Sequence, residues 1–360
     1  MHPDDPLERA DALIAQGRAG DAVALLQAML EQGRGGLLLH NSLVRALIAA
    51  GDTASALDAA RQGASLYPGV AVAAVTLGEA LLAAGHLPTA IGEFQRALRL
   101  DPALTDARLH LGEAWLEAGE AEKALEAFDA IGKADAAPRI ANRVAEAHAM
   151  RERQRSDPRY VRHLFDQFST DYDARMIGQL GYGAPTILRG LADLVIPDRS
   201  RRYSILDLGC GTGLAGLAFK DIALTLDGID LSPAMIAKAR SRKIYDELRV
   251  ADLESALADE DRKYDLLLAA DTVVYLGNLE NLLAGARRTL HLGGSFLLTV
   301  EKKAGEGFEL GPKRRWRHSE NYLRSEAARA NFEIVGLLEC HPRTEAGVPV
   351  EGYAMALLKT

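Results

Sequence analysis

The hydrophobic positions of this 360-residue chain follow two different patterns, and the change between them falls near residue 155. In the first part the pattern repeats every 34 residues. Three sets of residues keep one register: Gly17, Gly51, Gly85 and Gly119, then Ala22, Ala56, Ala90 and Ala124, and Leu13, Leu47, Leu81 and Trp115. This period predicts pairs of antiparallel helices, because the glycine breaks the chain between two helices and the alanine lets them approach closely.

The repeat resembles the tetratricopeptide repeat. Four units are expected, at Asp5–Gly36, Leu37–Gly69, Val70–Ala103 and Leu104–Ala137. Pro68 and Pro102 end the second helices of the middle units, whereas the first unit has Arg34 in that register. A last helix over Pro138–Arg153 is expected to cap the stack. The stack is expected to form a groove that binds a peptide or protein partner, and a scaffolding or dimerising role is the alternative.

From residue 156 onward, short apolar runs alternate with helical segments. Strands are predicted at Ile205–Leu208, Leu224–Asp230, Leu248–Leu253, Tyr264–Asp271, Ser295–Val300, Phe332–Cys340 and Gly352–Leu358. Helices are predicted at Val161–Asp173, Pro185–Leu194, Ala234–Arg242, Leu279–His291 and Glu320–Ala330, the fourth ended by Gly293-Gly294. This order predicts a mostly parallel sheet with helices on both faces. The charged run Arg151–Pro158 connects the two parts, so domains are expected at 1–155 and 156–360.

The stretch Leu206–Gly213 carries the clearest chemistry, because an apolar run ends in Asp207 and a glycine-rich turn follows it. Such a turn is expected to present backbone N–H groups to a ligand. Gly211–Gly216 spells G-x-G-x-x-G, the dinucleotide-binding pattern, which alone is weak evidence. Asp207 argues against a dinucleotide, because a carboxylate at this loop repels a pyrophosphate and attracts an ammonium group. S-adenosylmethionine carries an ammonium, a ribose diol and an adenine, and it has no phosphate.

The loop resembles the first motif of the class I S-adenosylmethionine-dependent methyltransferases. The chain as a whole resembles a group of predicted methyltransferases with N-terminal tetratricopeptide repeats, through Phe165…Tyr172, Arg317-His318-Ser319 and Arg343-Thr344-Glu345. The resemblance implies an α-helical solenoid followed by an α/β, Rossmann-like domain. The sheet of that domain is then mostly parallel and seven-stranded, with an antiparallel last strand. The implied cofactor is S-adenosyl-L-methionine.

Three acids, Asp207, Asp230 and Asp252, are expected at the carboxyl ends of consecutive parallel strands, where open α/β sheets bind ligands. Asp230 stands where an acid accepts hydrogen bonds from ribose hydroxyls, and a solvated strand end is the alternative. The resemblance implies that Asp252 accepts from the adenine amino group and that Leu253 offers its N–H to the ring. The predicted cofactor site comprises Tyr172, Asp207, Gly209, Cys210, Gly211, Gly213, Asp230, Leu231, Asp252, Leu253 and Ala270.

The resemblance also places the methyl acceptor beside Asp271 and Tyr275. Asp271 and His318 are the candidate catalytic bases, with a turn acid and a helix-cap histidine as the alternatives. The basic run Gly311–Ser319 has three interpretations. It holds an anionic acceptor through Arg315 or Arg317, it contacts RNA with Trp316 for stacking, or it is a solvated edge hairpin.

Composition narrows the function classes. Hydrophobic residues make up 48% and charged residues 26%, which is typical of a globular chain. The net charge of −8 arises in residues 1–150, with 20 acidic and 12 basic side chains, and argues against a nucleic-acid surface there. With Cys210 and Cys340 the only cysteines, neither a disulfide nor a metal site is expected. Met1–Pro6 lacks the features of a secretory signal and no apolar run reaches about 18 residues, so a cytoplasmic location away from membranes is expected.

The sequence therefore predicts methyl transfer from S-adenosylmethionine. A small hydroxylated or carboxylated metabolite is the first acceptor to consider, a protein recruited by the repeats the second, and RNA the third. A base is needed only if the acceptor is a hydroxyl or an ammonium group. Two other classes of function remain: a non-catalytic adaptor whose second domain senses the cofactor, and a nicotinamide-dependent oxidoreductase.

Overall fold

The computed structural model describes residues 5–33, 35–131, 138–178, 180–196, 198, 200–311 and 314–360. Expectations that involve the first four residues, Arg34, the end of the fourth repeat (132–137) and Pro312-Lys313 lie outside the described residues. The chain forms two compact units, Met1–Glu152 and Arg153–Thr360.

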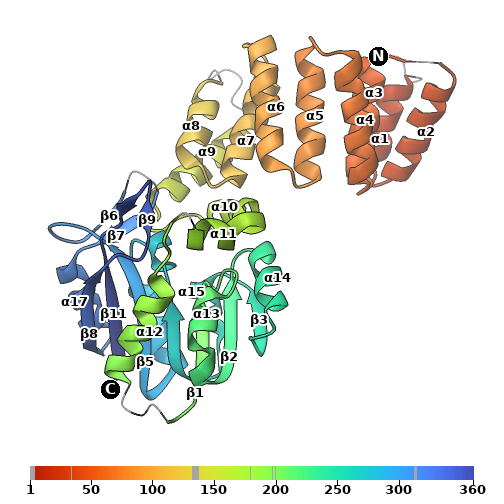
Figure 1. Cartoon of the computed structure of the whole chain (residues 1–360). Helices are drawn as coiled ribbons and strands as arrows, with labels where there is room; N and C mark the ends of the chain where they lie inside the picture. The colour runs from red at the N-terminus through yellow and green to blue at the C-terminus, as the bar shows by residue number, and fades with distance from the viewer. Residues whose placement is uncertain are drawn as a thin grey trace. The chain divides into compact units, whose positions relative to one another are not determined.

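The first unit is a row of helical hairpins (Figure 1), as the 34-residue period predicted. Its helices are α1 (Pro6–Ala15), α2 (Ala19–Glu31), α3 (Leu37–Ala49), α4 (Thr53–Leu66), α5 (Ala71–Ala83), α6 (Leu87–Leu100), α7 (Thr105–Glu117), α8 (Ala121–Asp129) and α9 (Pro138–Glu152). The four glycines of the period end the first helix of each hairpin with φ between 72° and 80°. That left-handed conformation suits glycine, which explains why the repeat keeps it there.

Each hairpin buries a large side chain opposite a small one. A Cβ added at Gly78 in α5 would lie 2.4 Å from the Phe94 ring in α6, and one at Gly112 in α7 would lie 2.3 Å from the Phe128 ring in α8. The same two repeat positions hold Val44 with Ala60 and Ala10 with Leu26, all buried. The size of the two residues changes from one repeat to the next, and each hairpin pairs a larger residue with a smaller one.

The second unit begins with helices and then alternates strands and helices. Its helices are α10 (Pro158–Phe168), α11 (Tyr172–Gly178), α12 (Ala184–Val195), α13 (Leu214–Phe219), α14 (Pro233–Ser241), α15 (Leu253–Asp259), α16 (Glu280–Thr289) and α17 (Glu320–Arg329). Short 3-10 turns lie at η1 (Ser169–Asp171), η2 (Lys220–Ile222) and η3 (Val273–Tyr275). Its strands are β1 (Tyr203–Leu208), β2 (Ala223–Asp230), β3 (Glu247–Val250), β4 (Tyr264–Ala269), β5 (Leu290–Lys302), β6 (Phe308–Leu310), β7 (Trp316–His318), β8 (Phe332–Cys340), β9 (Thr344–Glu345), β10 (Val348–Pro349) and β11 (Gly352–Lys359).

The main sheet runs β3-β2-β1-β4-β5-β11-β8. The strands from β3 to β5 are parallel, and β11 is antiparallel to both of its neighbours, which confirms the predicted sheet. Successive residues of β1 face opposite layers (Figure 1): Ile205 packs with α12 and α13, and Leu206 packs with α15, α16 and α17. The chain moves outward from β1 to β3 and returns to β4 on the other side of β1. The carboxyl ends of β1 and β4 therefore form a switch point, where open α/β sheets leave a crevice.

One local expectation needs correction, and the interpretation of the basic run as an edge hairpin agrees with the strand pairing. Gly293 and Gly294 do not end a helix, because α16 stops at Thr289 and both glycines lie within β5, Gly293 with a φ of 77°. The basic run includes a short antiparallel hairpin, β6–β7, whose second strand extends the sheet by pairing with Glu301 and Lys302 at the end of β5. Across the described residues, no helix combines the length and the apolar character needed to cross a membrane.

The hairpin packing of the first unit gives a stability prediction. Gly78→Ala is expected to destabilise the protein by about 1–3 kcal/mol, because the new Cβ overlaps the Phe94 ring. The matched control is Gly92→Ala in α6, where a Cβ would meet no atom within 4 Å. The control is expected to be neutral or to stabilise by up to about 1 kcal/mol, since alanine favours a helix over glycine. Urea unfolding followed by far-UV circular dichroism measures both, and equal effects would contradict the packing.

Candidate active site

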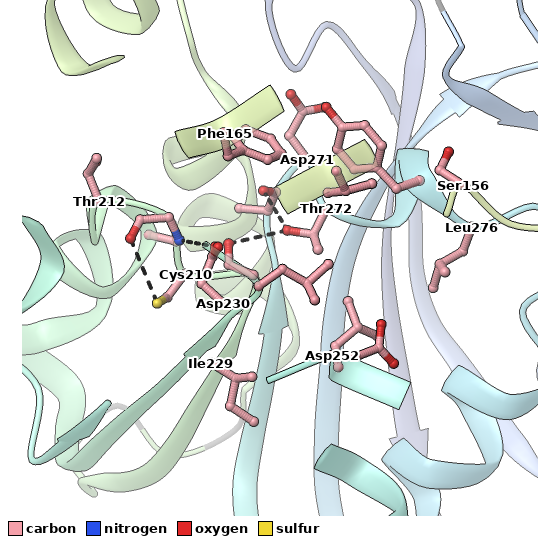
Figure 2. A pocket seen from close by; sticks show the side chains of 18 of the residues that line it. Ser156, Phe165, Cys210, Thr212, Ile229, Asp230, Asp252, Asp271, Thr272 and Leu276 are labelled. Atoms are coloured by element: carbon pink, nitrogen blue, oxygen red, sulfur yellow. Dashed lines mark hydrogen bonds between the residues drawn. The ribbon is translucent and has the colours of Figure 1, made fainter. Parts of the chain in front are cut away.

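A cavity of about 830 Å³ opens at the switch point between β1 and β4. Its wall comes from the loop after β1, the ends of β2 and β3, and the residues after β4 (Figure 2). The predicted site residues that line it are Tyr172, Gly209, Cys210, Gly211, Asp230, Leu231, Asp252, Leu253, Ala270 and Asp271. Asp207, Gly213 and His318 do not line it. The acids predicted at the ends of the parallel strands therefore indicated the place of the cavity. The three residues that do not line it are explained separately below.

The glycine loop uses most of its N–H groups internally. The amides of Gly209 and Cys210 both donate to the Ile229 carbonyl, at 2.8 and 2.9 Å, and the amide of Gly213 donates to the Cys210 carbonyl at 2.8 Å. The expectation that these groups stand open to a ligand is thus wrong for these three residues. Gly211 is the residue whose side is open: a Cβ there would meet no atom within 4 Å, and its φ is 55°.

Asp230 ends β2 and closes the loop against it. Its Oδ2 accepts a hydrogen bond of 2.8 Å from the Gly211 amide (Figure 2), and its Oδ1 accepts one of 2.8 Å from the Ser232 amide. Burial raises the pKa of Asp230 to about 6. Each carboxylate oxygen has a second lone pair, so Asp230 can still accept hydrogen bonds from a molecule in the cavity that it lines.

Asp207 lies behind the loop and lines neither this cavity nor the second one described below. It is fully buried, and its Oδ2 accepts a hydrogen bond of 2.7 Å from the Tyr245 hydroxyl. Burial raises the pKa of Asp207 to about 7, although the Tyr245 hydroxyl acts in the opposite direction. Tyr245 also packs closely on Gly216 and Gly228, where a Cβ would lie 2.3 and 3.0 Å from its side chain. The position of Asp207 is that of a support for the loop.

Asp252 caps α15 and is held by an arginine that the sequence analysis left in the connector. Its Oδ1 accepts from the Ser255 amide at 3.2 Å, and its carboxylate and that of Glu254 both form ion pairs with Arg155. Burial acts to raise the pKa of Asp252, but the Arg155 guanidinium and the hydrogen bonds from Ser255 together outweigh burial, and the pKa is lowered. Arg155 itself lines the cavity and belongs to the second unit.

The connector around Arg155 is built into the wall by backbone pairing. Arg155 forms an antiparallel bridge with Leu276, and the Ser156 amide donates to the Tyr275 carbonyl at 2.8 Å. The amide of Gly277 donates to the Gln154 carbonyl at 2.9 Å. This segment therefore contributes a rim to the cavity, as residues 153–156 run beside the turn that follows β4.

A second cavity, of about 1160 Å³, adjoins the first. Four residues line both the first and the second cavity: Phe165, Tyr172, Asp271 and Tyr275. The Phe165 ring meets Tyr172 and Tyr275 edge to face, with centroids 6.1 and 5.6 Å apart. The rest of the second cavity is lined mainly by apolar side chains of α10 and α11, with Arg315 and Glu345 at its polar side.

Asp271 stands at the junction in an uncommon backbone conformation, with a φ of 58°. Its amide donates to the Thr299 hydroxyl at 2.8 Å, and its Oδ1 is ion-paired with Arg343. Arg343 is only 1% exposed and also binds Glu301 and Glu345. Burial raises the pKa of Asp271, against the opposing charges of Arg343 and Arg315. A residue that lies on a cavity wall in an uncommon backbone conformation is a common feature of functional sites.

His318 is not brought to either cavity. It is fully buried, its Nε2 lies 3.0 Å from the Gly277 carbonyl, and its ring stacks on Tyr322 at 5.7 Å. Burial lowers the pKa of His318 to about 4. A base at this position has no contact with a ligand in either cavity, so the position of His318 does not suit a catalytic base.

The described residues of the basic run Gly311–Ser319 also differ in whether they reach a cavity. Trp316 packs edge to face on Phe308, and Gly277 has no room for a Cβ beside it, so the indole is no stacking surface for bases. Arg317 contacts Glu301 at 3.4 Å and lines neither of the two cavities. Among the described residues of the run, Arg315 alone reaches the second cavity.

Four residues that line the first cavity or hold one of the predicted acids are absent from the predicted site. Tyr182 lines the first cavity and donates to the Ala270 carbonyl at 3.1 Å. Arg155, Tyr245 and Arg343 each hold a predicted acid, but nothing in their spacing marks them. Two signals were available: the charged connector, which contains Arg155, and the segment Arg343-Thr344-Glu345, which carries part of the family resemblance. In the part of the chain that the structure describes, no group of three or more His, Cys, Asp or Glu side chains is placed to hold a metal ion.

Two parts of the chain match known protein families. Residues 205–294 match the family described as "Methyltransferase domain", and residues 81–147 match the tetratricopeptide repeat. The first match contains the glycine loop, Asp230, Asp252 and Asp271. The second lies wholly within the helical unit.

The chain is 29% identical over 147 residues to the 18S rRNA (guanine-N(7))-methyltransferase of Bos taurus, covering 40% of this chain and 50% of that protein. It is 30% identical over 114 residues to the mitochondrial ubiquinone biosynthesis O-methyltransferase of Rattus norvegicus, covering 30% of this chain and 33% of that protein. The chain thus spans half the length of the first relative and a third of the second. Magnesium protoporphyrin IX methyltransferase from Synechocystis PCC 6803 superimposes with a TM-score of 0.44 and 16% identity, covering 56% of this chain and 99% of that one.

These relatives differ in what their names say they methylate, and they share the methyltransferase domain. The sheet order, the glycine loop and the family matches agree with one another. The chain therefore combines a match to the tetratricopeptide repeat over residues 81–147 with a match to a methyltransferase domain over residues 205–294.

Proposed function

We propose that the second unit transfers a methyl group from S-adenosylmethionine, held in the first cavity, to a small acceptor held in the second. The observation that carries this proposal is the wall that the two cavities share. Phe165, Tyr172, Asp271 and Tyr275 line both, so a group bound in one cavity can meet a group bound in the other at these residues. A transferase needs such a junction, because its two substrates must react in contact.

The first cavity offers groups that suit each part of this cofactor. Asp230, at the end of β2, has lone pairs for the ribose hydroxyls. Asp252 and Leu253 stand beside the apolar residues Leu231, Ala251 and Leu276, an environment that suits adenine. Gly211 leaves the open side that a Cβ would fill. Asp207 lies behind the loop and supports it.

The loop fits a dinucleotide poorly. Phosphate binding at a glycine loop depends on unpaired N–H groups, and four of the N–H groups here donate to Ile229, Cys210 and Asp230. Asp230 adds a carboxylate to the same wall, whereas the carboxylate of Asp252 is paired with Arg155. These features favour a positively charged cofactor over a nicotinamide dinucleotide.

The bound cofactor supplies a methyl group on a positively charged sulfur, which makes that carbon electrophilic. The contribution of the chain is then to align the acceptor with the methyl–sulfur bond and to keep water away from it. The edge-to-face rings of Phe165, Tyr172 and Tyr275 form an aromatic wall at the junction that serves both purposes. Asp271, on the same junction, is the group placed to take a proton from the acceptor.

A protein acceptor is the second candidate, because the chain carries tetratricopeptide repeats. Repeats of this kind form extended surfaces that bind other proteins. We propose that residues 1–155 bind a peptide or protein partner, either as an acceptor or as a means of placing the enzyme. A purely adaptor role is less well supported, since the acids of the cofactor site are all present. RNA is a weaker candidate, because Trp316 is packed and Arg317 is paired with Glu301.

The cofactor assignment predicts a binding result. Wild-type protein is expected to bind S-adenosylhomocysteine, and Asp230→Asn is expected to weaken binding by about 10–100-fold, the effect of losing a charged hydrogen-bond acceptor. Asp221→Asn is the matched control, because Asp221 precedes the other end of β2 and its side chain is 66% exposed. Isothermal titration calorimetry of the three proteins measures the difference. Tighter binding of NAD than of S-adenosylhomocysteine would reject the assignment.

The raised pKa of Asp230 predicts a pH dependence of the same binding. Below about pH 6 the carboxyl of the free protein carries a proton, and that proton must leave before the carboxylate accepts from the ribose. The dissociation constant of S-adenosylhomocysteine is therefore expected to rise as the pH falls from 7 to 5, approaching about tenfold per pH unit. Asp230→Asn is expected to remove this dependence.

The buried Asp207 is the other acid with a pKa in this range, at about 7. Asp252 has a lowered pKa and stays ionised over the range. Asp207→Asn therefore serves as the comparison. A pH dependence of binding that persists in Asp230→Asn but vanishes in Asp207→Asn would show that Asp207 is the titrating acid. That result would contradict the prediction.

A further inference from the structure

The second cavity has an apolar body and one polar edge. Its body is lined by side chains of α10 and α11, among them Leu164, Phe165, Phe168 and Met176. Tyr160, Tyr172 and Tyr275 add aromatic surface. Flat ligands pack well against rings of this kind. The cavity therefore suits a molecule with an aromatic or similarly apolar body.

The polar edge pairs the Asp271 carboxylate with the Arg315 guanidinium, which form an ion pair but no hydrogen bond. Arg315 Nη1 lies 3.7 Å from Asp271 Oδ2, beyond hydrogen-bond distance, and it also lies 3.9 Å from Glu301 and 3.8 Å from Glu345. Within the described residues, Arg315 Nη1 makes no hydrogen bond. No hydrogen bond reaches Asp271 Oδ2 from those residues either, whereas Oδ1 is bound to Arg343. The edge thus holds a hydrogen-bond donor and an acceptor next to one another.

The charges behind this edge are balanced. Asp271, Glu301 and Glu345 face Arg315, Arg343 and Arg317 within 4 Å. Because three carboxylates meet three guanidinium groups, neither an anion nor a cation gains a net attraction from the cluster. An uncharged ligand group is favoured, since a charged one would be moved from water into a balanced, half-buried site.

The hydrogen-bonding pattern narrows the choice further. A carboxylate ligand accepts from Arg315 but has no proton to donate to Asp271, and an ammonium ligand donates to Asp271 but accepts nothing from Arg315. A hydroxyl group does both at once. A single oxygen that lies beside the two atoms can reach both of them, because they are only 3.7 Å apart.

We propose that the acceptor is an aromatic molecule bearing a hydroxyl group, and that the methyl group is transferred to the hydroxyl oxygen, with Asp271 as the base and Arg315 as the donor that holds that oxygen. The inference rests on the proposed function. In the step, the hydroxyl proton passes to Asp271 Oδ2 while the oxygen forms a bond to the methyl carbon. The carbon–sulfur bond breaks, and its electron pair stays on sulfur, so the products are a methyl ether, a protonated Asp271 and S-adenosylhomocysteine.

Arg343 is a positioning residue in this scheme. It is 1% exposed and lines neither of the two cavities, so a ligand does not touch it. Its ion pair with Oδ1 holds the Asp271 carboxylate so that Oδ2 faces Arg315. The αL backbone of Asp271 serves the same end, since aspartate tolerates this conformation better than most residues do.

The test uses three probes of one shape: 2-naphthol, 2-naphthoate and 2-naphthylmethylamine, which are neutral, anionic and cationic at pH 7. Each is titrated calorimetrically into the full-length protein saturated with S-adenosylhomocysteine. We expect 2-naphthol to bind at least about tenfold more tightly than the other two, because it alone satisfies both partners. Arg315→Met and Asp271→Asn are each expected to weaken 2-naphthol by about tenfold or more.

The matched control is Arg324→Met, which changes an arginine on α17 that pairs with Glu320 and lies outside both cavities and outside the charge cluster, and it is expected to leave all three affinities unchanged. For Arg315→Met, an S-adenosylhomocysteine affinity within about twofold of wild type shows that the variant is folded, since Arg315 lies outside the first cavity. Asp271 lines that cavity, so far-UV circular dichroism is used to show that Asp271→Asn is folded. Formation of 2-methoxynaphthalene from 2-naphthol and S-adenosylmethionine is a second readout, and Asp271→Asn is expected to reduce it more than it reduces binding.

The outcomes separate the two proposals. Tighter binding of 2-naphthoate or 2-naphthylmethylamine, an unchanged 2-naphthol affinity in Arg315→Met, or no binding of any probe to the protein saturated with S-adenosylhomocysteine overturns the hydroxyl assignment and leaves the proposed function standing. Failure of the wild-type protein to bind S-adenosylhomocysteine at all overturns the proposed function itself.

Discussion

The reversal of strand order between β1 and β4 is the constraint on which the site depends. The chain builds β2 and β3 outward on one side of β1 and then β4 and β5 on the other, so the loops after β1 and β4 leave in opposite directions. No crossover helix covers the gap between them. The two loops still touch at one point, because Gly209 lacks a Cβ that would lie 2.3 Å from Thr272. This contact fixes the separation of the loops, and the cavity forms beside it.

The polar groups of the site are held by other groups before any ligand is considered. Asp230 joins β2 to the glycine loop, Arg155 joins the connector to Asp252, and Arg343 binds three carboxylates at once. A buried charge is costly unless it is paired, and removing one partner leaves the other uncompensated. The acids can therefore be kept on cavity walls in defined orientations. The atoms that the network leaves without a partner, such as Arg315 Nη1, are those from which a ligand preference can be inferred.

The two units of the chain solve the packing problem in different ways. In the helical unit each hairpin pairs a large with a small side chain, as Phe94 does with Gly78, and the partners are 16 residues apart in the sequence. In the second unit the sheet pairs β1 with β4 and β5 with β11, and the strands of each pair are separated by much longer stretches of chain. Local contacts of the first kind leave a periodic trace in the sequence, and long-range contacts of the second kind do not.

The sequence by itself determined the helical repeat, the alternation of strands and helices, and the place of the ligand cavity. Periodicity, glycine turns and strand ends are local features, and the ends of parallel strands must meet at one edge of the sheet. That is why Asp230 and Asp252 were placed on the cavity wall without the structure. Tertiary structure alone decided that Asp207 lies behind the loop against Tyr245, that His318 is enclosed, and that Arg155 reaches Asp252 across 97 positions of sequence. Side-chain burial and charge pairing depend on residues that come together only on folding, and no local pattern records which partner each acid meets.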